Sequence, residues 1–320
     1  MDITIMEMAE RLKEYDEYII VYHIRPDGDC ICSSFALALA LKALGKKCAV
    51  VGQYDIPRIH RYMTDRVTMD EISDPVYIAV DSASPQRVGT YADRHFTFCI
   101  DHHHNIFDEA DYRYVEEDCG ACSEIILKLI KQLGVAVTKE IADLLYTAIV
   151  TDTLCFRTYD TDDQTFEAAA ELAKAGADIY RIGRINTFIK SSGRMKIEAI
   201  LRDSLHFTCD DRVVTGIITL SDLEAAGVED SELEGINSFV EQIEGIYIGA
   251  TIRELPEGKI RCSMRSSGDI SVNDICKIHG GGGHFHAACC DFDMSAQEVR
   301  QLIEQTCREY LENMGIATAE

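Results

Sequence analysis

The chain has 320 residues, long enough for two domains of ordinary size, and its 47% hydrophobic content is typical of a globular protein. It carries 31 Lys and Arg against 55 Asp and Glu, which gives a net charge of −24. This charge argues against broad binding to long duplex nucleic acid, because such binding depends on phosphate neutralisation, but it leaves room for a small phosphorylated substrate met by cations.

The start of the chain and its cysteines predict a cytoplasmic protein. Residues 1–4 open without the basic and apolar regions of a secretory signal, and the longest apolar run, residues 30–41, is too short to span a bilayer. The 13 cysteines are an odd number spread over both halves, so we expect reduced thiols. The CxxC pair Cys119 and Cys122 has no second pair to complete a metal site, and we interpret it as structural. Cys289 and Cys290 fit packing on a strand.

The first half of the chain alternates between strand-like and helix-like segments. Compact β-favouring runs occupy residues 18–22, 47–51, 76–80 and 96–100. Helical patterns occupy residues 3–17, 34–44, 123–133, 139–150, 163–176 and 178–189. This alternation predicts a parallel sheet, in which ligands gather at the carboxyl ends of the strands. His23, Asp81 and Asp101 stand at such ends.

The second half begins where the charge changes sign. Residues 181–202 hold six basic residues and one acid, and we place the domain connection within them, near residues 190–193. Beyond it, β-favouring runs at residues 213–220, 246–253 and 259–264 are separated by helical stretches. A last amphipathic helix is expected over residues 295–314, where Ser295 and Glu298 form a capping box.

Two clusters of acids and histidines indicate a metal site. Residues 101–104 read Asp-His-His-His directly after a strand, and residues 23–29 read His-Ile-Arg-Pro-Asp-Gly-Asp. Imidazoles and carboxylates are the usual ligands of divalent metals. In an extended turn, Asp27 and Asp29 would project to one side. Taken singly, either cluster could instead be an ordinary polar turn.

The acids at the ends of strands and helices indicate a metal site more strongly when they are considered together. Several carboxylates in one cleft are unfavourable unless cations neutralise them. Two divalent ions roughly 3.5–4 Å apart, bridged by a carboxylate, would do so and would make a phosphoryl-transfer site. The candidates are His23, Asp27, Asp29, Asp81, Asp101, His102, His103 and Asp152.

A run of four glycines, Gly280 to Gly283, precedes His284. It could be a flexible loop. However, it lies between a predicted helix and a predicted strand, and successive glycine amides can form a concavity that binds anions. With Arg265 and Ser266 upstream, the favoured interpretation is a cradle for a phosphate or nucleotide.

Taken together, these stretches resemble the motifs of the DHH phosphoesterases that carry a DHH-associated C-terminal domain. The matching stretches follow the family's order: His23 to Asp29, then Ala79-Val80-Asp81-Ser82, then Asp101-His102-His103 with Asn105, then Thr151-Asp152-Thr153, and finally Gly280 to His284 with Ala287-Ala288. The branch in question comprises two-domain enzymes that degrade very short RNAs (nanoRNA), the bisphosphonucleotide pAp and linear or cyclic di-adenylates.

The resemblance implies an α/β fold of two domains with the active-site cleft between them. Residues 1–190 would form the catalytic DHH domain, a parallel sheet with flanking helices. Residues 191–204 would form a connecting helix. Residues 205–320 would form a smaller α/β domain with a mixed sheet that binds the substrate.

The resemblance also implies two divalent metal ions, usually manganese. One ion would be held by His23, Asp27 and Asp81, and Asp81 would bridge to the other. The second ion would be held by Asp29, Asp81, His102 and Asp152. His103 would act as a general acid or phosphate clamp, with Asp101 orienting the neighbouring histidines. The grip on the terminal nucleotide would come from Arg265, Ser266, Gly281, Gly282, Gly283 and His284.

The implied reaction is hydrolysis by a metal-activated hydroxide. Short oligoribonucleotides and the linear di-adenylate pApA would give 5′-mononucleotides, and pAp would give AMP. A manganese-dependent inorganic pyrophosphatase shares the first-domain motifs but has a Ser-Arg-Lys-type signature in its second domain. A cyclic-di-AMP phosphodiesterase, a longer RecJ-type exonuclease and a non-catalytic nucleotide sensor are further alternatives. Whether the chain forms a homodimer is left open.

The chain departs from the family pattern at three positions where glycine is usual. These are Cys32, Leu154 and Cys289. We expect Cys32 and Leu154 to narrow the substrate cleft. His104 has no role in the family pattern, and we expect it at the surface.

Overall fold

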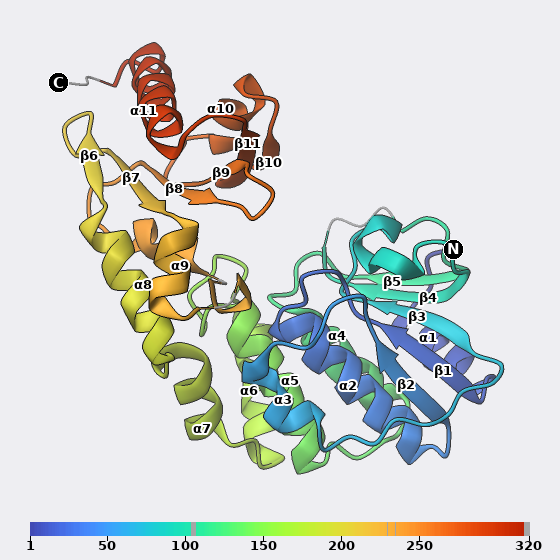
Figure 1. Ribbon diagram of the computed structural model, residues 1–320. Helices are drawn as coiled ribbons and strands as arrows, with labels where there is room; N and C mark the ends of the chain where they lie inside the picture. Colours follow the sequence, from blue (N-terminus) through green and yellow to red (C-terminus); the bar gives the residue numbers. More distant parts are fainter. Residues whose placement is uncertain (104–106, 229, 234, 317–320) are drawn as a thin grey trace. The chain divides into compact units, whose positions relative to one another are not determined.

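The computed structural model describes residues 1–103, 107–228, 230–233 and 235–316 (Figure 1). They form two compact units, Met1–Ile189 and Lys190–Glu320. His104 and Asn105, both part of the predicted third motif, lie outside the described residues.

The first unit is built on a five-stranded parallel sheet of order β2-β1-β3-β4-β5. Its strands are β1 Glu17–Val21, β2 Lys47–Val51, β3 Val76–Val80, β4 Phe96–Asp101 and β5 Tyr112–Val115. The pairs Val21↔Ala79 and Val80↔Ile100 place the carboxyl ends of β1, β3 and β4 at one edge of the sheet. The predicted parallel sheet is confirmed. Only the short β5 was not predicted, because all four of its residues are half-buried and no apolar run marks it.

Helices pack against one face of this sheet, while the 3₁₀ helix η1 Pro85–Tyr91 and the segment around Phe107 and Ala110 cover the other. The helices are α1 Ile5–Lys13, α2 Gly28–Ala43, α3 Arg58–Thr64, α4 Cys122–Gln132, α5 Lys139–Asp152, α6 Asp163–Lys174 and α7 Ile179–Gly183, with the short π-helix η2 Arg184–Phe188. Helices α2, α4 and α5 pack against one another (Figure 1). Helix α2 is apolar nearly all round, because it is buried between the sheet and these neighbours.

Helix α2 begins six residues before the predicted start at Ser34. Its N-cap is Asp27, whose side chain accepts a hydrogen bond from the backbone N–H of Cys30 at 3.0 Å. The expectation that Asp27 and Asp29 share an extended turn is therefore wrong. An aspartate at the N-cap starts a helix at once, so Gly28 and Asp29 already belong to its first turn.

The second unit is built on a six-stranded sheet of order β10-β11-β9-β8-β7-β6. Its strands are β6 His206–Thr208, β7 Val213–Ile218, β8 Ile248–Glu254, β9 Ile260–Ser266, β10 Gly282–His284 and β11 Ala287–Phe292. Strands β7 and β8 are parallel and the other pairs are antiparallel, which confirms the expected mixed sheet.

The second sheet is covered on both faces. The covering elements are α8 Ser192–Asp203, α9 Leu220–Ala226, α10 Val272–Ile278 and α11 Ala296–Asn313, with the short helices η3 Asp230–Leu233 and η4 Ile236–Gln242. Strand β7 shows why both covers are needed. Its Val213 and Ile217 belong to the core under α10 and α11, whereas Val214 and Ile218 belong to the core under α8 and η4.

All thirteen cysteines are free thiols, and eleven of them are buried. Cys155 is half-buried and Cys289 is exposed. The core under α10 and α11 contains five of the buried ones: Cys209, Cys262, Cys276, Cys290 and Cys307. Among the helices that the structure describes, none combines the length and apolar character needed to cross a membrane.

Candidate metal centre

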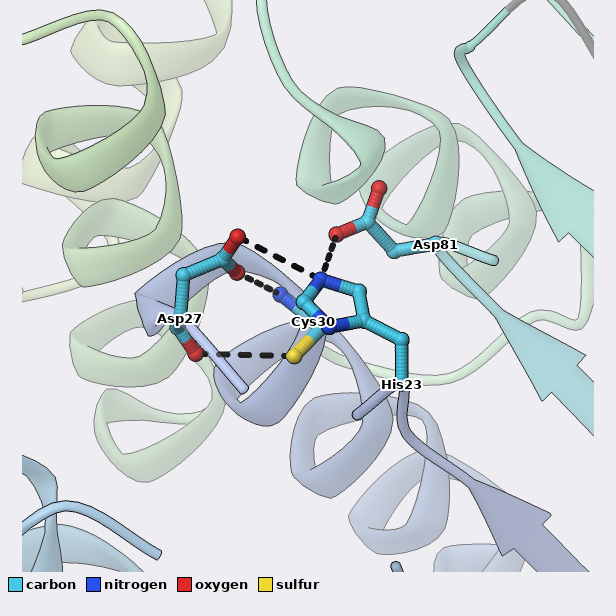
Figure 2. A group of neighbouring side chains, drawn as sticks. All are labelled: His23, Asp27, Cys30 and Asp81. Atoms are coloured by element: carbon cyan, nitrogen blue, oxygen red, sulfur yellow. Dashed lines mark hydrogen bonds and ion pairs between the residues drawn. The ribbon is translucent and has the colours of Figure 1, made fainter. Parts of the chain in front are cut away.

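His23 follows β1 and is 1% exposed. Its ring Nδ1 lies 2.9 Å from the carbonyl oxygen of Ile24, which can only accept a hydrogen bond. This contact places the proton on Nδ1 and leaves the Nε2 lone pair free to bind a metal. Nε2 has no hydrogen-bond partner, and it faces Asp27 Oδ2 at 3.3 Å and Asp81 Oδ2 at 3.7 Å (Figure 2).

His102 follows β4 and repeats this arrangement. Its Nδ1 lies 2.9 Å from the carbonyl oxygen of Cys119, and its buried Nε2 has no hydrogen-bond partner. Nε2 faces carboxylate oxygens of Asp152 at 3.3 Å, Asp81 at 3.5 Å and Asp29 at 3.9 Å. Two buried imidazole nitrogens thus point at carboxylates without a hydrogen bond, as they would if each coordinated a cation.

Asp81 lies between the two histidines at the end of β3. Its Oδ2 faces His23 while its Oδ1 faces His102, so its two oxygens point to two different donor groups. Its backbone has a φ of +55°, in the left-handed region that residues other than glycine rarely adopt. Such conformations cluster at functional sites, and this one aims the carboxylate between the two strand ends.

Asp29 has a structural task besides facing His102. Helix α4 has Ala121 at its N-cap, which has no side chain able to cap it. Asp29 replaces the missing cap, because its carboxylate accepts hydrogen bonds from the backbone N–H groups of Cys122 at 2.6 Å and Ser123 at 3.2 Å. Its position in the first turn of α2 therefore helps to fix the start of α4.

The concentration of carboxylates shifts their pKa values. Burial, and then the charge of Asp81, raises the pKa of Asp29 to about 7. Burial and the neighbouring Asp29 raise the pKa of Asp152 well above its usual value. A divalent cation would reverse this tendency and keep both carboxylates ionised. The donor set therefore fits divalent metal ions.

Asp101 supports the two histidines that follow it. It is fully buried, and its Oδ1 accepts hydrogen bonds from the backbone N–H groups of His102 at 2.8 Å and His103 at 3.1 Å. The same oxygen lies 3.0 Å from His103 Nδ1. Hydrogen bonds to Asp101 and then Asp81 raise the pKa of His103 to about 11, so this half-exposed ring is protonated at neutral pH before cations bind.

Three sets of donor atoms could each hold an ion, since the atoms of each set lie within 4.8 Å of one another. The sets are His23, Asp27, Cys30 and Asp81; Asp81, His102 and His103; and Asp29, His102 and Asp152. The structure thus brings together every residue predicted as a metal ligand. Cys30 was not predicted, because it opens an apolar run; its place three residues after the N-cap Asp27 was the available signal.

Arg265 and His284, predicted to grip the substrate, lie in the second unit on the two strands that flank β11. Both are paired with Ala287, Arg265 from β9 and His284 from β10. Residues directly opposite each other in a sheet share a face, so both side chains leave the same face. Ser266 ends β9, and its hydroxyl donates to the carbonyl oxygen of Ile270 at 2.6 Å.

The glycine run does not form the expected series of free amides. The backbone N–H groups of Gly280, Gly281 and Gly283 donate to Lys277, Cys276 and Asn273 within the unit. Two of the glycines are required by close packing instead. A Cβ at Gly281 would lie 2.2 Å from the Cys289 carbonyl oxygen, and one at Gly283 would lie 2.4 Å from that of Ala287.

A cavity of about 220 Å³ lies beside Arg265, Ser266 and Ser267. It could not be predicted from the sequence, because its walls come from η4, β8, β9 and the turn before β8. Its other lining residues are Val240, Ile243, Gly245, Ile246, Tyr247 and Gly249.

Comparisons with known proteins identify the family of the chain. Residues 17–149 match the DHH family, N-terminal domain, and residues 212–312 match the DHHA1 domain. The chain is 32% identical over 314 residues to the bifunctional oligoribonuclease and PAP phosphatase NrnA of Thermus thermophilus, with 93% of each chain covered. The chain belongs to the DHH family. Because such DHH relatives are named for the hydrolysis of phosphoester bonds, it is a hydrolase of that class.

Two further likenesses extend the DHH comparison. The chain is 28% identical over 246 residues to a probable manganese-dependent inorganic pyrophosphatase of Bacillus cytotoxicus. The alignment covers 72% of this chain and 79% of the relative. The crystal structure of an exopolyphosphatase-related protein from Bacteroides fragilis has the same fold, with a TM-score of 0.88, 22% identity and 97% of both chains covered.

The structure shows the surroundings of the three residues that depart from the DHH pattern. Cys32 is fully buried in α2, so the expectation that it narrows a cleft is wrong. Leu154 is 47% exposed and has a φ of +47°, in the left-handed region that favours glycine. A glycine in the family pattern at this position is therefore explained by the backbone. Cys289 lies exposed on β11, and nothing in the structure explains its replacement of glycine.

Proposed function

We propose that this DHH-family hydrolase is a manganese-dependent phosphodiesterase and phosphatase that acts on very short oligoribonucleotides. Its products from nanoRNA and pApA would be 5′-mononucleotides, and its product from pAp would be AMP. The observation that carries the proposal is the placement of Asp81 between the unpartnered Nε2 atoms of His23 and His102. The names of the relatives support the substrate class and the choice of manganese.

In this proposal one ion is held by His23, Asp27 and Asp81. The other is held by Asp29, Asp81, His102 and Asp152. Carboxylate and imidazole donors suit manganese. Bound divalent ions would polarise the phosphoryl oxygens and lower the pKa of a water molecule.

His103 would contact the phosphate. Its Nδ1 lies 3.0 Å from the buried Asp101 carboxylate, which would hold the ring as a proton donor, and the half-exposed ring can reach a bound molecule. In the reaction it would hydrogen-bond a phosphoryl oxygen or deliver a proton to the leaving oxygen. Asp101 would hold its ring in place throughout.

The second unit would bind the nucleotide. Arg265 and His284 leave the same face of its sheet and would contact phosphate. The neighbouring cavity has apolar walls and Tyr247, which suits a nucleobase. The net charge of −24 restricts this recognition to short substrates, because long duplexes would be repelled.

A panel of substrates tests the proposal. The protein would be incubated with manganese and, in separate reactions, with pAp, pApA, a five-nucleotide RNA, cyclic di-AMP and pyrophosphate. We expect mononucleotides from the short RNA and pApA. Hydrolysis of pyrophosphate alone would overturn the proposal in favour of a pyrophosphatase.

The Asp81→Asn variant tests the metal centre in the same assay. We expect kcat/KM to fall by at least about a hundredfold, because the change weakens the ligand that faces both donor groups. Asp118→Asn is the control, since Asp118 is exposed and lies outside the three donor sets. Wild-type turnover in Asp81→Asn would refute the two-ion assignment.

A further inference from the structure

The thiol of Cys30 lies among the donors of the first metal position. Cys30 occupies the first turn of α2, where its backbone N–H donates to Asp27 Oδ1 at 3.0 Å. This cap fixes the side chain beside the Asp27 carboxylate. Its Sγ lies within 4.8 Å of a ligand atom from each of His23, Asp27 and Asp81 (Figure 2).

The local contacts leave this sulfur available for coordination. Cys30 is fully buried, and its Sγ contacts the carbonyl oxygen of Asp27 at 3.6 Å, a weak hydrogen bond that coordination could replace. Cys32 is a useful comparison. It is equally buried, two residues further along the same helix, and belongs to none of the three donor sets.

We infer that Cys30 is a ligand at the first metal position, where it completes a set of one imidazole, two carboxylates and one thiolate with His23, Asp27 and Asp81. A thiolate donor favours softer divalent ions such as zinc, cobalt and ferrous iron over manganese. Coordination forms a metal–sulfur bond and releases the thiol proton to solvent.

The two positions of the centre then differ in chemistry. The set around Asp29, His102 and Asp152 contains only oxygen and nitrogen donors and suits a hard ion such as manganese. The set around Cys30 suits a softer one. This inference rests on the metal centre of the proposed function, but it does not depend on which substrate is hydrolysed.

Cobalt(II) absorption spectroscopy on the full-length protein tests the inference. Visible d–d bands report that cobalt is bound, and a near-ultraviolet charge-transfer band reports a thiolate ligand. We expect the wild type to show both features. Cys30→Ala should lose the charge-transfer band and keep d–d bands, whereas the control Cys32→Ala should keep both.

Competition titrations give a second readout. We expect Cys30→Ala to weaken zinc binding by at least about tenfold, with a smaller effect on manganese. Should Cys30→Ala fail to fold, X-ray absorption on the cobalt-loaded wild type would show or lack a sulfur neighbour at about 2.3 Å from the metal.

The outcomes separate this inference from the proposed function. Absence of d–d bands in the wild type, or bands that Asp81→Asn leaves unchanged, would overturn the metal centre itself. Wild-type d–d bands without a charge-transfer band would overturn only the role of Cys30. A charge-transfer band that persists in Cys30→Ala would do the same, because the thiolate would then come from another cysteine.

Discussion

His23 and His102 have the same hydrogen-bonding pattern, although they follow different strands. In each ring Nδ1 donates to a backbone carbonyl, and the buried Nε2 faces carboxylates. A carbonyl partner fixes the tautomer, which prepares the ring for a cation before one arrives. His103 differs because its Nδ1 faces Asp101 and Asp81, so it keeps a proton. Neighbouring histidines thus acquire different chemistry from their partners alone.

The contrast leads to a prediction for His103. Replacement by glutamine should lower kcat by about 10²- to 10⁴-fold, as expected on loss of a general acid. Cobalt binding, measured by absorption, should change little. His95→Gln is the matched control, because His95 is exposed and paired with Asp111. Unchanged kcat in His103→Gln would remove His103 from the chemistry.

A buried histidine outside the three donor sets provides a pH prediction. His60 in α3 is 3% exposed, and burial lowers its pKa from 6.5 to about 4. Between these two values the unfolded chain binds more protons than the folded one, so the stability falls as the pH drops through this range. Full loss of this contribution amounts to about 3 kcal/mol.

The non-titrating variant His60→Gln isolates that contribution. Urea denaturation at pH 7 and pH 5 should show a smaller pH-dependent loss of unfolding free energy in the variant than in the wild type. Equal losses in the two proteins would assign the acid sensitivity to other groups.

The aspartates and histidines that the structure brings together could be picked out from the sequence, because they follow strands, begin α2 or end α5; their role as metal ligands stays a prediction. The contacts that fix them could not be predicted. The capping of α4 by Asp29 joins residues more than ninety positions apart, and Cys30 looks like an ordinary apolar residue until the fold places it beside His23. The glycine amides were also misjudged, since only the folded hairpin shows that they donate to Lys277, Cys276 and Asn273.

At the scale of elements, the turn after α5 is the most unusual backbone near the centre. Leu154, Cys155 and Phe156 have φ values of +47°, +62° and +63°. The turn is held by backbone hydrogen bonds from Cys155 to Val150 and from Arg157 to Thr153. Since Asp152 ends α5 immediately before it, this turn helps to position a predicted metal ligand.

Glycine usually lowers the stability of a protein, but the left-handed backbone at Leu154 predicts the opposite effect there. Leu154→Gly should raise the free energy of unfolding by 0 to about 1 kcal/mol, because relief of the left-handed conformation outweighs the greater freedom of the unfolded chain. Leu220→Gly is the control, since Leu220 is similarly exposed and begins helix α9. Urea denaturation measures both. A clear loss of stability in Leu154→Gly would contradict the explanation.

At the scale of the whole molecule, each hydrophobic core cluster found among the described residues draws its members from one unit. The two core clusters of the first unit draw on residues between Met8 and Ile182, and the two of the second on residues between Ile197 and Leu311. Each unit of the described chain thus has its own core clusters, two in each.

Separate cores predict separate folding. Residues 190–320 produced alone should unfold cooperatively in urea, as followed by circular dichroism. Residues 1–189 alone should bind cobalt with d–d bands but should not release mononucleotides from short RNA, since Arg265 and His284 are missing. A non-cooperative transition in the isolated second unit would show that it depends on the first.

The buried cysteines would allow the opening of these cores to be followed by thiol labelling. Eleven thiols are buried, six in the first unit and five in the second, while Cys289 alone is exposed. A brief pulse of alkylating reagent would therefore mark the native chain at Cys289 and, more slowly, at the half-buried Cys155, and an adduct on any of the other eleven thiols would mark a core that had opened. Because both units contain buried thiols, mass spectrometry of the labelled peptides could time the loss of each unit in one sample without an introduced label.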